Sequence, residues 1–551
     1  MVVGQEVARF LFQRIASGAL VIVFASALTF FFVNLAPGGP SSIMRFDVSA
    51  EQREALIKRM GLDKPVVERY ADWAAGAIRG DLGTSLLSDE PVTQRIGERL
   101  PNTLILAGAA LVVSILIGIP IGLIQALRRG SALDHLLSFY SAIGLAVPVF
   151  WLGIVLILVF AVSLGWLPSA GVTTISEDTL VERLRHLALP TVALATTTLP
   201  TIVRFMRSAA ERRRGPRAAA PRRHGGDGVG LQLAGHGSPR AGSRAGTRLP
   251  ADHRHHRRRR RDRGRDDPAR RPRVHANRSK AAGVVTRLGL FALATLGVIA
   301  VLVVAGPLFW TIAPETTNPA QGLAGPSLVH PLGADELGRD VLSRLLHGGR
   351  VTLLVGVAAM LASLLIGVVV GAIAGFNGGW LDALLMRFTD GMLAVPAFFF
   401  ILVVITLVGT SVGTLVLVIG ALSWMPVARV VYGETLRWKT AEFVVAATSL
   451  GVPPPRLLVR HILPQAIPSL VVSATLGVAF AILTESALSY LAFGVQPPLP
   501  SWGNMLQRAQ QYVFTAPALA LYPGLAITVV VLAFNFLGDG LRDALDPRRR
   551  R

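Results

Sequence analysis

The residue types that usually carry catalysis are sparse in this 551-residue sequence. The chain has no cysteine, which excludes thiolate nucleophiles, disulfides and cysteine metal sites. It contains no Gly-x-x-x-x-Gly-Lys-Ser/Thr loop for nucleotide phosphates, and no Ser/His/Asp arrangement or metal-ligand spacing rises above chance. We therefore expect no catalytic residue, no metal site and no cofactor bound by this chain.

One carboxyl group stands where an ionised side chain is costly. Glu485 lies in an apolar run, and ionisable residues in such runs usually face a partner helix or a wet cavity. It is therefore a candidate residue of a pathway or subunit interface. The alternative, which we prefer, is a hydrated group near the external boundary. Pro148 and Pro396 occupy corresponding apolar runs in the two halves and should kink them, which would permit a gating movement or serve packing alone.

A polar interruption between two later apolar runs has the pattern of a docking element. The segment Glu442–Gly451 predicts a short amphipathic helix that ends in a glycine turn, and a second helix then leads into the next apolar run. Ala446 and Ala447 are small, so a partner surface could approach closely. On physical grounds alone, an ordinary interhelical loop explains the pattern equally well.

The elements that position these residues are membrane spans. Hydrophobic residues make up 52% of the chain and charged residues 16%, unlike an average soluble protein. A spanning helix needs about 20 mostly apolar residues, and on this basis we predict an all-α polytopic membrane protein with about ten spans. These are Ile15–Ala36, Thr103–Leu127, Leu136–Leu164 and Leu187–Phe205 in the first half, and Val285–Phe309, Val351–Phe376, Met386–Val408, Val412–Val431, Leu470–Tyr490 and Ala516–Phe536 in the second.

Basic residues beside the short loops set the orientation. Arginines precede the first span, follow the second and fourth, and recur in the loop that holds Glu442 and in the tail Arg548–Arg551. These segments should be cytoplasmic, which places both termini inside. The arginines near Arg344 then fall outside, where neighbouring acidic residues offset them.

Charge is concentrated in one segment. Ser208–Lys280 has 21 arginines and one lysine against six acidic residues, about +16 of the formal +22. Because it lacks Ile, Phe, Tyr, Trp and Met, it cannot bury enough apolar surface to offset chain entropy, and we expect disorder. Such a run could attract nucleic acid or anionic lipid, but we expect no nucleic-acid partner. A metal site at His253–His256 would lack a constraining fold.

The docking segment resembles a cytoplasmic loop of ABC importer permeases. The matching residues are Ala446-Ala447, Gly451 and Leu463-Pro464, with Glu442 as the first acidic residue; Val445 stands where that family usually has glutamate. The resemblance implies that this loop seats in a cleft of an ATPase subunit. The implied docking residues are Glu442, Ala446, Ala447, Gly451, Leu463 and Pro464.

Further stretches are similar to the dipeptide and oligopeptide permeases. His330–Arg344 and Gly494–Met505 resemble external loops of that family, and Gly538–Pro547 resembles its C-terminal signature. The first half resembles the companion permease, with matches at Pro37–Pro40, Gly61–Pro65, Arg79–Ser85 and Leu100–Thr103 in that order. The chain therefore looks like two companion permeases joined: a first half at 1–206 with four spans and an external segment near 37–100, and a second half at 281–551 with six spans and a docking loop near 433–468.

The resemblance implies a type I ABC importer fold in the cytoplasmic membrane. Peptides or related small solutes would be moved, two cytoplasmic ATPase subunits would use the ATP, and an extracytoplasmic solute-binding protein would deliver the solute. Residues 207–280 replace the companion's last spans and docking loop. They are either a basic linker or a sequence translated out of frame, after the reading frame slipped near Met206 and before it returned near Ala281. Two alternatives are an ion-coupled secondary transporter and a non-functional frameshifted product.

Overall fold

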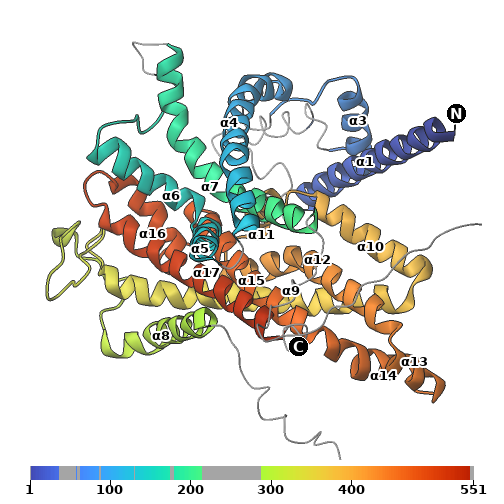
Figure 1. Cartoon of the computed structure of the whole chain (residues 1–551). Helices are drawn as coiled ribbons and strands as arrows, with labels where there is room; N and C mark the ends of the chain where they lie inside the picture. Colours follow the sequence, from blue (N-terminus) through green and yellow to red (C-terminus); the bar gives the residue numbers. More distant parts are fainter. Residues whose placement is uncertain are drawn as a thin grey trace, which may run out of the picture. The chain divides into compact units, whose positions relative to one another are not determined.

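The chain is almost entirely helical where its structure is described. The computed structural model describes residues 2–35, 58, 63–85, 88–128, 131–173, 179–213 and 287–545, and within these ranges extended pairing is limited to two isolated bridges (Figure 1). Two compact units are distinguished, Met1–Glu211 with Val284–Arg551, and Arg212–Gly283. The predicted linker or out-of-frame segment lies, beyond Arg213, outside the described residues.

The first half supplies six named helices to the larger unit. They are α1 (Val2–Leu35), α3 (Val66–Ile78), α4 (Val92–Leu127), α5 (Ala132–Ala146), α6 (Val149–Leu156), which continues as the π-helix η2 (Ile157–Ser163), and α7 (Leu180–Arg213). Helix α3 lies within the predicted external segment and packs on α1, where Tyr70 is 5.4 Å from Phe30 between ring centroids.

The second half runs from α8 to α17. Its elements are α8 (Arg287–Phe309), η3 (Pro319–Gln321), α9 (Val341–Asn377), α10 (Gly379–Ala394), α11 (Ala397–Val408), α12 (Val412–Lys439), α13 (Glu442–Ser449), α14 (Pro454–Leu457), η4 (Leu458–Ile462), α15 (Leu463–Tyr490), α16 (Trp502–Ala509), η5 (Gln510–Tyr512) and α17 (Ala518–Leu545).

Within the described ranges, seven helices are long and apolar enough to cross a membrane. An eighth span results if α5 and α6–η2, which meet at a bend of 101°, are counted together. Two of the ten predicted spans do not reach this length. Met386–Val408 is divided between α10 and α11, and Ile15–Ala36 falls in α1, of which Ile22–Phe31 qualifies as a shorter apolar helix.

The long helices of the first half pack through a seam of small residues. A methyl group on Gly118 of α4 would come within 2.9 Å of Ile202 in α7, and one on Gly122 within 2.7 Å of the Val203 carbonyl oxygen. Only glycine permits this approach, as in other close helix pairs of membrane proteins. The seam fixes α4 against α7.

The second half repeats this seam with α9 and α12. A methyl group on Gly367 would come within 2.6 Å of Val427, and one on Gly371 would meet the carbonyl oxygen of Ala428. Each of these contacts has a counterpart in the contacts of Gly118 and Gly122. Helix α4 therefore corresponds to α9, and α7 to α12. The two halves are structural repeats, in agreement with the two joined permeases expected from the sequence.

The repeat can be followed in the described residues to the end of α7. Helix α7 ends at Arg213 and α12 ends at Lys439. Counted from the corresponding residues Val203 and Ala428, the two helix ends lie equally far along the chain to within one residue. The next element of the second half is α13. A counterpart of α13 in the first half would begin inside 214–286, outside the described residues.

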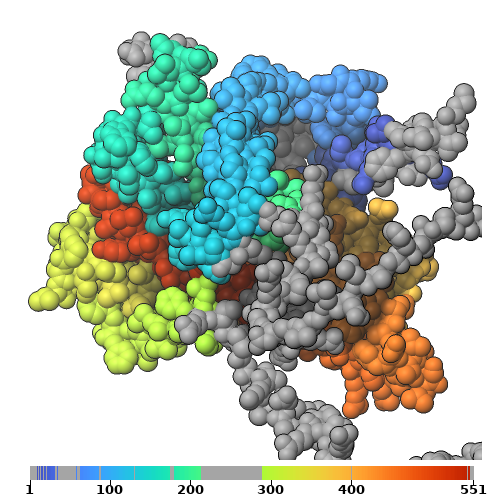
Figure 2. Space-filling view, in the orientation of Figure 1, coloured from blue at the N-terminus to red at the C-terminus, as the bar shows by residue number. Residues whose placement is uncertain are grey.

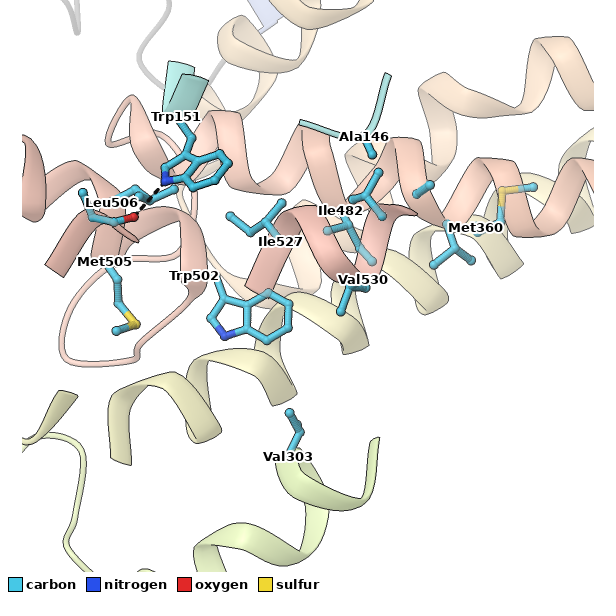
Figure 3. Packing of buried hydrophobic residues seen from close by; sticks show 14 of the residues in the cluster. Ala146, Trp151, Val303, Met360, Ile482, Trp502, Met505, Leu506, Ile527 and Val530 are labelled. Atoms are coloured by element: carbon cyan, nitrogen blue, oxygen red, sulfur yellow. Dashed lines mark hydrogen bonds between the residues drawn. The ribbon is translucent and has the colours of Figure 1, made fainter. Parts of the chain in front are cut away.

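The main core joins the halves (Figure 3). Trp502 is buried among α9, α15 and α17, and its indole N–H donates to the carbonyl oxygen of Leu345 at 2.9 Å. Trp151 of α6 enters the same core and donates to the Ala520 carbonyl oxygen of α17 at 3.0 Å. Buried indole groups need such partners, so these two bonds orient α16 and α6 on the second half.

Aromatic pairs extend the contact between the halves. Phe139 stacks on Phe536 of α17, with ring centroids 5.9 Å apart, and Phe150 stacks on Tyr490 at 4.6 Å. Stacked aromatic pairs contribute roughly 0.5–1.5 kcal/mol beyond their buried area. The first half is therefore attached to the second through α5 and α6, and also through α1, where Phe24 packs edge-on against Phe388 of α10 with ring centroids 6.3 Å apart.

Candidate functional site

The loop between α12 and α15 stands on a small core of its own. Val444 and Ala447 of α13 are buried against Leu457 and Ile462, and the partly buried Phe376, Trp438, Ala441, Val452 and Leu458 surround them. The Lys439 ammonium group donates to the carbonyl oxygen of Phe376 at the end of α9. The loop is thus fixed to both α12 and α9, as a rigid docking element requires.

The predicted helix and turn form where the sequence placed them. Helix α13 begins at Glu442, whose carboxylate lies in the first turn, where the helix dipole favours negative charge. Gly451 follows the helix with φ of +79°, a conformation that glycine adopts without strain. Leu463 and Pro464 open α15, with Pro464 in the first turn, where its missing N–H costs no hydrogen bond. The motif therefore specifies a helix, a reversal and a new helix.

The two alanines of the motif point in different directions. Ala446 is exposed, whereas Ala447 is only 8% exposed and packs inward beside Val444. The expectation that both would face a partner is therefore wrong for Ala447. Its small size serves the loop's own core.

Larger apolar residues make up the outward face of this loop. Phe443, Val445 and Leu450 are 41%, 53% and 84% exposed, and we call them, together with Ala446, the apolar docking face. In Figure 2 the orange residues of this region stand out at the edge of the described surface. A soluble surface rarely leaves such residues together unless they meet a partner. This exposed apolar face was not predicted from the sequence, although Val445, an apolar residue in place of glutamate, pointed toward it.

Basic residues border the apolar docking face. Arg456 and Arg460 are exposed on the segment after Gly451, and the Arg437 side chain is 63% exposed and lies over the Trp438 ring, 4.9 Å from its centroid. An apolar centre with a charged rim is the usual organisation of a protein interface. The rim favours a partner with acidic residues around an apolar cleft.

The base of the loop is tied to the next long helix. Glu434 of α12 accepts a hydrogen bond from the Ser469 hydroxyl of α15 at 2.7 Å and another from the Trp438 indole at 3.0 Å. These groups border a cavity of about 520 Å³ between α12, α15 and the end of α17. A force on α13 would therefore reach α12 and α15 together.

Glu485 is fully buried, with 0% of its surface exposed. Its carboxylate accepts a hydrogen bond from Ser489 at 2.7 Å and a longer one from Ser486 at 3.4 Å. The preferred interpretation of a hydrated boundary group is therefore wrong, because α16 packs over this part of α15: a methyl group on Gly503 of α16 would come within 2.6 Å of the Ser486 carbonyl oxygen. Glu485 lies at an interface between helices of one chain, and its part in a pathway stays a prediction.

Pro148 and Pro396 end helices rather than kink them. Each is the residue before a new helix, α6 and α11, and each follows a residue in the extended region, Val147 or Val395. The residue before proline avoids the helical conformation, so the first helix ends at both places, with a bend of 101° between α5 and α6. The repeat therefore contains the same break twice; a gating movement at these breaks stays a prediction.

A buried polar network orders the segment between α8 and α9. The Asp340 carboxylate accepts hydrogen bonds from the Trp310 indole at 2.9 Å and the Ser343 backbone N–H at 2.6 Å, and it contacts His330 Nδ1 at 2.8 Å. Arg339 pairs with Asp335 at 2.7 Å beside it. The resemblance at His330–Arg344 gives no sign of this network, because Trp310 lies far away along the chain.

Among the described residues no group of three or more His, Cys, Asp or Glu could hold a metal ion. The predictions of no metal and no cofactor stay predictions. The geometry describes a rigid loop with an exposed apolar face that is linked to long helices, and it offers no reacting group at that face.

Comparisons with known proteins agree with this arrangement. Residues 118–216 and 367–551 match the family described as binding-protein-dependent transport system inner membrane component, and residues 7–107 match the N-terminal membrane component of such systems. The two matches of the first family begin at Gly118 and Gly367, the paired glycines of the two seams. The first of these matches ends three residues past α7.

Relatives of the chain carry the names of peptide and glutathione permeases. The chain is 38% identical over 244 residues to a dipeptide transport system permease of Alkalihalophilus pseudofirmus, covering 44% of this chain and 80% of the relative. It is 39% identical over 257 residues to an oligopeptide transport system permease of Haemophilus influenzae (46% and 83%), and 42% identical over 224 residues to a glutathione transport system permease of Pectobacterium atrosepticum (41% and 74%).

Proposed function

Because the chain belongs to the family of inner membrane components of binding-protein-dependent transport systems, we propose that it is a permease component of an ATP-driven importer of peptides. Its relatives carry the names of dipeptide, oligopeptide and glutathione permeases. The solutes in these names are all short peptides, so short peptides are the solute class that the relatives favour. Related small solutes remain within the same proposal.

The observation that carries the proposal is the docking loop. It presents an exposed apolar face on a fixed base, and its two ends continue into α12 and α15. A partner that binds this face and changes shape would move both helices as one body, since Glu434 and Ser469 join them. Such a two-state movement, biased by ATP in the partner, is what alternating access requires.

The partners are part of the proposal. Two cytoplasmic ATPase subunits use the ATP, one of them seated on the docking loop, and an extracytoplasmic binding protein delivers the solute. The chain itself hydrolyses nothing, both termini lie in the cytoplasm, and the long helices face the lipid bilayer of the cytoplasmic membrane. Glu442, Ala446, Gly451, Leu463 and Pro464 are the proposed coupling residues, with Ala447 acting from inside the loop.

The proposal is tested by reconstituting the chain in liposomes with its ATPase subunits and binding protein. We expect ATP hydrolysis that rises when peptide-loaded binding protein is added. Solute transport that persists after ATP is removed and stops when the proton gradient is dissipated would instead support the ion-coupled transporter.

A non-functional product is the second candidate, because the Arg-rich residues 207–280 stand where the resemblance implies the last spans and the docking loop of the first half. This candidate predicts no hydrolysis in the same assay. Resequencing the DNA across codons 200–290 separates the causes. A second frame with two apolar spans and an Ala-Ala-x-x-x-Gly motif would identify a frameshift.

A further inference from the structure

A second cavity lies between the two halves of the chain. It has a volume of about 750 Å³ and is bordered by α4, α5 and α7 of the first half and by α8 and α17 of the second. Its apolar wall is formed by Phe139, Leu288 and Phe536. Phe139 and Leu288 are 43% and 46% exposed, so this wall stays open although Phe139 stacks on Phe536.

The cavity opens on the same side of the chain as the docking loop. Arg542, near the end of α17, borders this cavity and also borders the cavity at the base of the docking loop, with Glu434 and Trp438. Gln125 borders it from the last turn of α4 and Arg207 from within about two turns of the end of α7, and the counterparts of these helices, α9 and α12, end beside that loop. It therefore lies where one face of the membrane meets water.

Arginines gather at the polar end of the cavity. Arg207 is held by Asp134 at 3.0 Å and by the Ser138 hydroxyl at 3.3 Å. Arg204 and Arg542 are exposed and form no hydrogen bond or ion pair with the residues that the structure describes. Asp134 and Glu211, the latter 3.3 Å from Arg207, balance the charge of Arg207, and Asp539 is the carboxylate among the lining residues. Arg204 and Arg542 are therefore the arginines of the polar end that are left to meet an anion.

We infer that this cavity binds an anionic phospholipid. Its phosphate would pair with Arg204 and Arg542, and an acyl chain would lie along Phe139 and Leu288. Arginine recognises phosphate through paired N–H donors, and basic pockets between membrane helices on the cytoplasmic side are sites for anionic headgroups. A solute with no acyl chain would leave the apolar wall exposed.

The position of the site gives the lipid a structural role. Arg204 belongs to α7 of the first half and Arg542 to α17 of the second. One phosphate between them joins the halves beside the Phe139–Phe536 stack. The site rests on the proposed function only for the name of the leaflet, which is cytoplasmic if the docking loop is.

Lipid binding to the purified full-length chain tests the inference directly. Short-chain phosphatidylglycerol and phosphatidylcholine are titrated separately, and phosphatidylglycerol retained from the membrane is measured by mass spectrometry. We expect a preference for phosphatidylglycerol that falls at least fivefold in the double variant Arg204→Gln/Arg542→Gln, since each arginine near an anionic headgroup contributes about that factor.

The matched control is Arg387→Gln/Arg456→Gln, which removes the same charge from exposed positions elsewhere. An equal loss in both double variants would mean general attraction of lipid and would overturn the site. Displacement of the lipid by millimolar inorganic phosphate alone would show that the site recognises free phosphate rather than a phospholipid. These results do not depend on ATP hydrolysis, so they fail or succeed separately from the proposed transport function.

Discussion

Leu450 offers the sharpest test of the docking loop. Its side chain is 84% exposed at the end of α13. A partner that covers the apolar docking face would therefore bury most of the surface of Leu450. Burying a leucine contributes about 1.5–3 kcal/mol, and alanine keeps part of this. Leu450→Ala should therefore weaken binding of the ATPase subunit by about 1–2 kcal/mol, roughly 5- to 30-fold in Kd.

The assay measures the Kd for binding of the ATPase subunit to the purified chain. The matched control is Leu328→Ala, because Leu328 is 99% exposed between α8 and α9, far along the chain from the docking loop. Both exposed substitutions should leave the unfolding temperature of the chain unchanged. Equal Kd values for the wild type and Leu450→Ala would refute the assignment of the apolar docking face, and an equal loss in Leu328→Ala would remove its specificity.

Three further predictions concern the helices that the loop moves. Gly371→Ala should destabilise the chain by about 1–3 kcal/mol, because the new methyl group meets a backbone carbonyl; Gly433→Ala, in open space, should not, and equal unfolding temperatures would contradict the seam. Glu485→Ala should cost about 1–3 kcal/mol by leaving buried hydroxyl groups unpaired, and Glu485→Gln should cost less; the reverse order in thermal unfolding would argue against a positioning role. Asp340→Ala should increase proteolysis between α8 and α9 by roughly tenfold, because three donors lose their acceptor, and unchanged cleavage would count against the network.

The sequence was most informative where local rules decide the structure. Glu442 as the start of a helix and Gly451 as a left-handed turn depend on neighbours a few residues away, and both are confirmed. The resemblance to peptide permeases is confirmed as well, since long matching segments are specific. The structure adds the correspondence of α4 with α9, which pairs Gly118 with Gly367 through their contacts.

The sequence was least informative where distant contacts decide. Nothing near Ala446 and Ala447 indicates which of them faces Leu457 and which faces outward, since that depends on how the loop folds back. Glu485 was expected near water, and only the packing of α16 makes it buried. A kink was expected at Pro396, but the sequence did not indicate that one helix ends before it and a new one begins after it.

ATP-driven uptake of a labelled short peptide into proteoliposomes tests the central claim most directly. The vesicles contain the chain and its ATPase subunits, with ATP on the ATPase side and loaded binding protein on the other. The account predicts uptake that requires ATP, survives a proton ionophore and falls in Leu450→Ala but not in Leu328→Ala. Uptake that ignores ATP, or no uptake from a chain that binds its ATPase normally, would contradict it.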